Sequence, residues 1–212
     1  SKFKDALSVS TSFTGTSTSL RIKSLKISSH DRHILLNADG SVSDWSARLR
    51  WYANIRQLKV SDAGIQSLAG QLGHHLQIPA VITRLGDIHF KGLVGGVSQD
   101  IALKGILDTD AGKVNLAVGR HGRQFTGRME TANLDLKRIL ADNRFGNTAT
   151  RINIDGELPK SRQLKDAMIK AQGIISQFTY NSYIYKNLSI DGIYRRGAFD
   201  GKLGMDDPNG KI

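Results

Sequence analysis

A strict two-residue alternation of apolar and polar side chains over residues 45–56 constrains the fold most. One set is Trp45, Ala47, Leu49, Trp51, Ala53 and Ile55, and the other is Ser46, Arg48, Arg50, Tyr52, Asn54 and Arg56. Successive side chains of a β-strand point to opposite faces, so the segment predicts a strand with one apolar face and one basic, solvated face.

The same alternation recurs along most of the chain, and in two places it shifts by one residue. Leu20 and Ile22 are followed by Leu25 and Ile27, and the strand predicted over 44–60 changes parity near Gln57. Each shift predicts a β-bulge. Asp39-Gly40 is a dipeptide typical of hairpin turns, so we expect it to close a strand over 34–38.

Two stretches change to a helical period. Ile65, Leu68, Ala69 and Leu72 predict a helix over 62–73, which Asp62 would cap at its start and Gly73 at its end. Leu136, Ile139 and Leu140 predict a second helix over 134–141. Residues 161–171 fit either a helix or an irregular strand, and we favour the strand. The fold class predicted is therefore mainly β, with one or two short helices.

A short motif, apolar-x-apolar-x-Gly, occurs at 88–92, 101–105, 152–156 and 188–192. A single copy needs no repeat to explain it, because a strand of a meander often ends in glycine. Several copies favour a serial, extended sheet with repeat units near 1–61, 62–133 and 134–212. The abrupt first and last residues suggest a fragment of a larger repetitive protein.

Composition narrows the functional classes without choosing one. A net charge of +11 suits nucleic acid, an anionic membrane surface or anionic headgroups, but also a merely well-solvated surface. No apolar run approaches the roughly 20 residues that span a bilayer, and no signal peptide is visible. The absence of cysteine excludes disulfides and thiolate sites.

Catalytic signatures are missing from the sequence, so we do not expect an enzyme, a metal site or a cofactor. Residues 92–96 are glycine-rich but lack the lysine and the helix of a phosphate loop, and we expect a hairpin there. The histidine pairs, 30/33 and 74/75, lack the spacing of a catalytic zinc site. Asp155, Asp191 and Asp200 each precede a glycine, and we interpret them as turn formers.

Nucleic-acid binding is the alternative that the charge favours. The basic residues are spread over the whole chain, however, and no aromatic RNA-binding motif or zinc finger accompanies them. We therefore expect no nucleic-acid partner.

The C-terminal third carries a recognisable succession of motifs. Residues 134–146 read LDLKRILADNRFG, residues 183–192 read YIYKNLSIDG, and residues 199–209 read FDGKLGMDDPN. This succession resembles the TamB group (translocation and assembly module) of the AsmA-like proteins of Gram-negative envelopes. Residues 55–105 resemble it more loosely, so that the likeness covers about 55–210, and the first 50 residues depend on pattern alone.

The resemblance implies a long, curled antiparallel sheet, an open β-groove or "β-taco", with an apolar interior. It implies a periplasmic protein held by an inner-membrane anchor outside this fragment. Its implied role is phospholipid transport to the outer membrane, or assistance to outer-membrane protein assembly with a barrel partner. The family has no catalytic residues to transfer.

An apolar strip has a physical reason in such a role. Burying one CH₂ is worth about 0.8 kcal/mol, so a 16-carbon chain in water costs on the order of 12 kcal/mol. The alternative is that the apolar parity is the core of a closed sandwich or barrel, whose basic face serves protein interaction or nucleic acid. The candidate lining of the lipid groove is Trp45, Leu49, Trp51, Ile55, Ile88, Phe90, Ile101, Leu103, Val114, Leu116, Phe125, Ile152, Ile154, Ile174, Phe178, Leu188, Ile190, Phe199 and Leu203.

Overall fold

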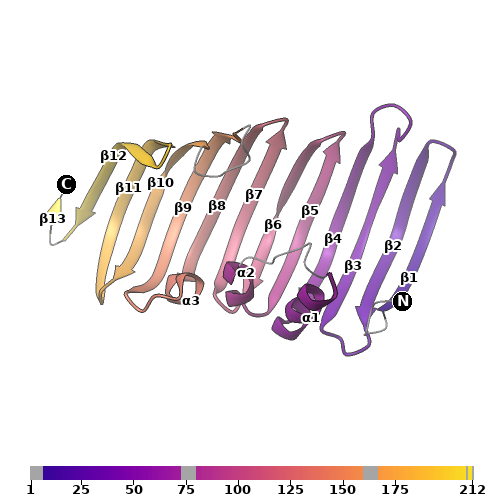
Figure 1. Ribbon diagram of the computed structural model, residues 1–212, viewed down its shortest axis with the longest axis horizontal. Coiled ribbons are helices and arrows are strands. Elements are labelled where there is room, and N and C mark those ends of the chain that lie inside the picture. The colour runs from indigo at the N-terminus through magenta and orange to yellow at the C-terminus, as the bar shows by residue number, and fades with distance from the viewer. Residues whose placement is uncertain (1–6, 73–79, 160–166, 209, 212) are drawn as a thin grey trace. The chain divides into compact units, whose positions relative to one another are not determined.

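The chain folds mainly into antiparallel β-strands that follow one another in sequence order (Figure 1). The computed structural model describes residues 7–72, 80–159, 167–208 and 210–211. The strands are β1 Leu7–Gly15, β2 Ser19–Ser29, β3 Ile34–Ser43, β4 Arg50–Val60, β5 Ile88–Val97, β6 Asp100–Thr109, β7 Gly112–His121, β8 Gln124–Asp135, β9 Phe145–Glu157, β10 Met168–Tyr180, β11 Tyr183–Arg195, β12 Ala198–Asp207 and β13 Gly210–Lys211.

No pairing among these described strands closes the sheet into a barrel, which confirms the predicted fold class of an open, mainly antiparallel sheet. It also removes the closed barrel from the alternatives. The chain divides into two compact units, residues 1–98 with 105–111 and residues 99–104 with 112–212. The three repeat units expected from the sequence remain a prediction.

In unit 1, strands β1 to β5 form an uninterrupted antiparallel ladder. Both predicted bulges are present. The β2–β3 register shifts between Ile22 and Leu25, and the β4–β5 register shifts between Ile55 and Leu58. Each bulge adds one residue, and Leu58 therefore returns to the face that Ile55 occupies.

In unit 2, strands β7 to β12 form a second uninterrupted ladder, and β13 pairs with the end of β12. Strands β9, β10 and β11 pair with one another over nearly their full length. For example, Ile154 is opposite Ala171, which is opposite Gly192 on its other side. Directly paired residues of an antiparallel ladder share a face, so the register assigns each side chain to one face.

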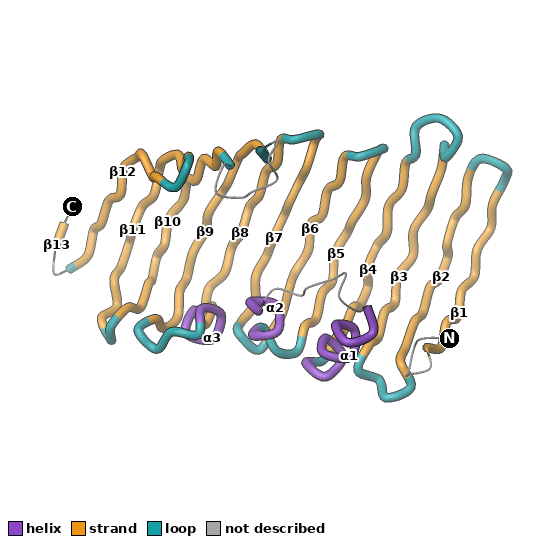
Figure 2. The backbone as a smooth tube through the Cα atoms, in the orientation of Figure 1, coloured by secondary structure: helices purple, strands orange, loops and turns teal. Residues whose placement is uncertain are grey.

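The described residues form three short helices, α1 Asp62–Leu72, α2 Ala80–Arg84 and α3 Leu136–Leu140 (Figure 2). The sequence predicts α1 and α3 but misses α2, although Ala80 follows a proline, a residue common at helix starts. The predicted helix end at Gly73 lies outside the described residues, as does most of the segment 161–171.

The cap of α1 differs from the prediction. Ser61, not Asp62, is the N-cap, because its Oγ accepts a hydrogen bond from the Gly64 amide at 3.2 Å and its carbonyl accepts one from Ile65 at 2.9 Å. In α3, the Asp135 side chain accepts from the Arg138 amide at 3.0 Å, and Ala141 ends the helix in the left-handed region at φ 54°.

The glycines that we expected in turns lie inside strands instead. Asp39-Gly40 is in the middle of β3, and residues 92–96 belong to β5 rather than to a hairpin. The Asp-Gly pairs at 155, 191 and 200 lie within β9, β11 and β12. The turn interpretation is therefore wrong at each of these sites, and the structure supplies another reason for the glycines.

Candidate functional site

The register of unit 2 places one row of apolar side chains on a single face, which we call the apolar face. Ile154 and Ile152 of β9 share it with Met129 of β8, and Ile190 of β11 shares it with Leu203 of β12. The remaining members given by pairing are Leu116, Val118, Phe125, Ile169, Ala171, Ile175, Leu188, Tyr194, Phe199 and Met205.

Unit 1 repeats this arrangement on its own strands. Trp51 of β4 pairs with Val42 of β3 and with Gly96 of β5, and Leu58 pairs with Leu36 and with Phe90. On the same face by pairing are Leu7, Val9, Phe13, Leu20, Ile22, Leu25, Ile27, Ile34, Ala38, Ala53, Ile55, Val60, Ile88 and Val94. The opposite face of both units, the polar face, carries mostly hydroxyl, amide and charged side chains.

Glycines on the apolar face accommodate the large side chains beside them. A Cβ on Gly156 would lie 2.4 Å from Cζ of Phe125, and one on Gly192 would lie 2.4 Å from Cζ of Phe199. In unit 1 a Cβ on Gly105 would lie 2.6 Å from Cζ of Phe90. In three of the four copies of the recurring motif, the glycine thus leaves room for a phenylalanine ring, a pairing known to stabilise sheet glycines.

The apolar face is half-buried along its central strands and most exposed on the edge strands β1 and β12. Among the described residues, seven apolar side chains are buried, and three of these are alanines. Leu203 is 65% exposed and Phe13 61%. Exposed apolar side chains that gather on one face are typical of a binding surface or of a site of aggregation.

The polar face is held by ion pairs and hydrogen bonds across strands. In unit 2, Arg151 of β9 donates to Glu130 of β8 at 2.5 Å. That hydrogen bond, with help from the charges of Arg151 and Arg128, lowers the pKa of Glu130 below its ordinary value. In unit 1, Asp39 accepts from Asn54 at 3.1 Å and from Arg56 at 2.8 Å.

A hollow of about 990 Å³ opens on the polar face of unit 2. Its lining includes the Glu130–Arg151 pair and the side chains of Asn153, Gln172 and Asp191. Arg151 donates to Glu130 here, and Gln172 donates to Asp191 at 3.4 Å, so the hollow contains polar pairs beside apolar side chains such as Ile174.

Most candidate lining residues lie on the apolar face. Trp51, Ile55, Ile88 and Phe90 do so in unit 1, and Leu116, Phe125, Ile152, Ile154, Phe178, Leu188, Ile190, Phe199 and Leu203 do so in unit 2. Val114 is buried in β7 at the same strand parity as Leu116. Ile101 and Leu103 lie in β6, where Ile101 is exposed and Leu103 half-buried.

Ile174 lies on the polar face, so its assignment to one row with Phe178 is wrong. It pairs with Arg151 of β9 and Ser189 of β11. Ser176 is an extra residue in β10, where the register with β9 shifts between Ile175 and Gln177. The bulge reverses the parity, so that Ile175 occupies the apolar face before it and Phe178 after it.

Trp45 and Leu49 are also placed wrongly by the sequence, because β4 begins only at Arg50. Both lie in the loop that joins β3 to β4, with 45% and 36% of their surface exposed. Asp44 adopts a left-handed conformation at φ 56°, and its carbonyl accepts from the Ala47 amide at 3.1 Å. Because of this turn, the alternation that begins at Trp45 precedes the start of the strand at Arg50 by five residues.

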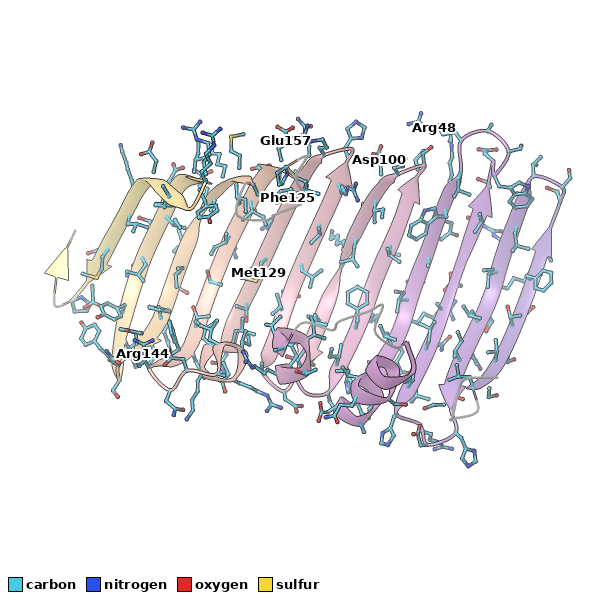
Figure 3. All side chains as sticks on the ribbon, viewed as in Figure 1. Arg48, Asp100, Phe125, Met129, Arg144 and Glu157 are labelled. Atoms are coloured by element: carbon cyan, nitrogen blue, oxygen red, sulfur yellow. The ribbon has the colours of Figure 1, made fainter. Side chains whose placement is uncertain are left out.

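Sequence reasoning missed an aromatic cluster where β9, β10 and β11 end. The rings of Phe145, Phe178, Tyr180, Tyr183 and Tyr185 contact one another in series, with centroids 4.6–6.4 Å apart. Figure 3 shows Arg144 at this end of the strands and Phe125 and Glu157 at the other. The clustering of tyrosines at 180–185 was the available signal.

Only one arrangement in the described chain approaches hydrolase chemistry, and it serves as a helix cap. Ser61 Oγ lies 2.8 Å from His33 Nδ1, and His33 Nε2 lies 3.7 Å from Asp31. Because the Gly64 amide already donates to Ser61 Oγ, that oxygen is engaged in capping α1. Within the described ranges no three His, Cys, Asp or Glu side chains gather as metal ligands would.

Comparisons with known proteins give no relative: no protein-family model, no curated protein and no solved structure matches this chain. In the described part of the chain, no helix has the length and apolar character to cross a membrane.

Proposed function

We propose that this chain is a segment of an AsmA-like, periplasm-spanning β-groove that shields phospholipid acyl chains on their way to the outer membrane, without catalytic chemistry. The observation that carries the proposal is an open sheet whose apolar face is only partly buried. That face repeats across β1–β5 in unit 1 and β7–β12 in unit 2. In the same proposal, an anchor elsewhere in the protein holds it at the inner membrane, and a barrel protein is its outer-membrane partner.

The physical argument rests on the difference between the two faces. Acyl chains need a continuous apolar surface to cross water, because each exposed methylene costs about 0.8 kcal/mol. Headgroups do not need cover, and an open sheet leaves them in water. Such a surface is offered by the row Met129, Ile152, Ile190 and Leu203, which crosses five strands with Gly173 of β10 between Ile152 and Ile190.

The net charge of +11 supports an anionic partner but does not select one. In unit 2, Arg151 on the polar face is already paired with Glu130. We therefore assign the charge to solubility and to contact with anionic headgroups, and the apolar face to the cargo.

Photo-crosslinking tests the proposal in cells. Benzophenone side chains at Ile190 and Ile154, on the apolar face, should capture phospholipid. The same probe at their strand neighbours Ser189 and Asn153, on the polar face, should capture little. Equal capture on both faces, or none on the apolar face, would contradict the proposal.

Salt dependence separates lipid from nucleic acid. Lipid retained through purification should respond weakly to salt, because its chains are held by apolar contact. Nucleic-acid affinity would fall steeply with salt, because each phosphate contact releases a counterion. Steep salt-dependent binding of RNA or DNA, with no extractable lipid, would favour the nucleic-acid alternative.

A further inference from the structure

The five-ring cluster of unit 2 continues the apolar face to the ends of β10 and β11. Phe178 lies between Tyr180, whose ring is nearly parallel at 6.4 Å, and Tyr185 at 6.3 Å. Phe145 meets the edges of Phe178 and Tyr180 at 6.1 and 5.2 Å. Rings packed against one another in this way form a stiff wall, since such contacts add to plain area burial.

A hollow of about 290 Å³ opens beside this wall. Its lining is almost wholly apolar and consists mainly of Phe178, Tyr180, Tyr185, Leu188, Leu203 and Met205. The volume lies at the lower limit of small-molecule sites, about 300 Å³. The hollow therefore fits a single alkyl chain rather than a complete two-chain lipid.

The polarity of the site changes along the strands. At one end of the site lie the aliphatic side chains of Leu188 and Leu203, and the aromatic rings lie in the middle. Hydroxyl and charged groups lie at the other end. At that end the Tyr183 hydroxyl donates to the buried Asp207 at 2.5 Å. The Arg144 guanidinium lies 6.0 Å from the centre of the Tyr180 ring and is paired with Asp142 at 2.6 Å.

We propose that this hollow binds one alkyl chain of an anionic amphiphile, with the anionic group beside Arg144 and the Tyr180 ring. The order runs from aliphatic side chains to aromatic rings to a charged end that holds Arg144 together with Asp142 and Asp207. It matches the order of parts in an amphiphile, as the aromatic belts of membrane proteins do at lipid interfaces. The proposal rests on the proposed function and deepens it, because it assigns a position and an orientation to the cargo.

Arg144 is held in place by its neighbours, which suits this role. The hydrogen bonds and charge of Asp142, with a smaller contribution from Tyr180, raise the pKa of Arg144 above its ordinary value. Arg144 is therefore always a cation, and Asp142 is the anion that a ligand headgroup would have to displace or share.

Fluorine NMR of the whole chain labelled with 3-fluorotyrosine tests the site without any substitution. The chain has five tyrosines. Three, at 180, 183 and 185, belong to the cluster, while Tyr52 and Tyr194 lie outside it. Titration with monomeric dodecyl phosphate should shift the three cluster signals in a saturable way and leave Tyr52 and Tyr194 nearly unmoved.

Variants then separate the chain contact from the charge contact. Phe178→Ala should weaken binding of dodecyl phosphate and of neutral dodecyl maltoside alike, by about tenfold. Arg144→Gln should weaken dodecyl phosphate alone, by about threefold, and Asp142→Asn should strengthen it by a similar factor. Ile174→Ala, on the polar face, is the matched control and should change neither affinity. The Tyr52 and Tyr194 signals report whether each variant is folded.

Each outcome decides the matter. Silent cluster signals, or equal shifts at Tyr194 and the cluster, would overturn the proposed site, and crosslinking of lipid at Ile190 and Ile154 would still support the proposed function. Loss of both the crosslinks and the shifts would overturn the two together. Unchanged dodecyl phosphate affinity in both Arg144→Gln and Asp142→Asn would refute the assigned orientation.

Discussion

Along β9 the side chains of Ile152 and Ile154 alternate with those of Arg151 and Asn153, and the two sets meet different surroundings. Ile152 faces Met129 and Gly173, so its stabilisation comes from packing. Arg151 is tied to Glu130 on the next strand. Ile152 and Ile154 are half-buried, whereas Arg151 and Asn153 are exposed. The comparison teaches that apolar packing holds the side chains of one face, and that a cross-strand ion pair in water holds Arg151 on the other.

The largest expected effect is on the free energy of unfolding, and it compares a buried with an exposed side chain of the apolar face. Leu134→Ala should lower the free energy of unfolding by about 2–4 kcal/mol, because Leu134 is only 7% exposed and its loss leaves a cavity. Leu203→Ala, at 65% exposure, should lower it by less than about 1 kcal/mol. Urea unfolding checks both. Equal losses would mean that Leu203 is ordinary core.

A smaller effect distinguishes glycines on the two faces. Gly173→Ala should destabilise the sheet by about 1–3 kcal/mol, because its Cβ would lie 2.3 Å from the Arg151 carbonyl oxygen and 2.9 Å from Cγ1 of Ile152. Gly119→Ala, on the polar face opposite Thr126, meets only the Thr126 hydroxyl at 3.0 Å. The midpoint of thermal unfolding should therefore be lower for Gly173→Ala than for Gly119→Ala. Similar midpoints would show that the apolar-face glycines are not needed to make room for large neighbours.

The helix cap gives a still smaller change. Ser61→Ala should cost about 1 kcal/mol, since it removes the acceptor for the Gly64 amide at the start of α1. Asp62→Ala is the matched control, because Asp62 is not the N-cap. A greater loss in Asp62→Ala, measured by chemical denaturation, would restore the cap that the sequence suggested.

The smallest effect is a pH dependence confined to the polar face. Because Arg151 lowers the pKa of Glu130 in the folded state, the pair stabilises the fold above the ordinary glutamate pKa. That contribution is lost as the pH falls through the lowered, folded-state value. Wild type and Glu130→Gln should thus differ in urea midpoint at pH 7 and converge towards pH 3. A constant difference would show that the pair has no electrostatic role.

Much of this fold could be predicted from the alternation of apolar and polar side chains. The alternation predicted most of the strands and the two bulges of unit 1, and the change to a helical period predicted α1 and α3, since those features depend on the local order of apolar side chains. It failed for Ile174, because Ile174 and Ile175 are both apolar and nothing local reveals the bulge at Ser176. It failed for the Asp-Gly pairs, because a turn glycine and a glycine beneath Phe125 or Phe199 look alike until the neighbouring strand is known.

The members of the apolar face could likewise be predicted only in part from the sequence. Rows such as Ile152, Ile154 and Ile190 follow from parity. The aromatic wall does not, because Phe145 and Phe178 are far apart in sequence and are brought together only by the β9–β10 register. Trp45 and Leu49 obey the alternation yet lie in a loop, where the conformation of Asp44 decides the course of the chain.

The most direct test of the account replaces two similarly exposed side chains on opposite faces. Leu203, 65% exposed, and Ile174, 58% exposed, are each changed to lysine, and phospholipid retained per purified protein is measured by mass spectrometry. Both variants should keep the wild-type circular dichroism spectrum, because neither side chain is buried. The account predicts that Leu203→Lys loses most of its lipid and Ile174→Lys retains it. Equal retention in the two variants, or loss only in Ile174→Lys, would contradict a lipid-binding role for the apolar face.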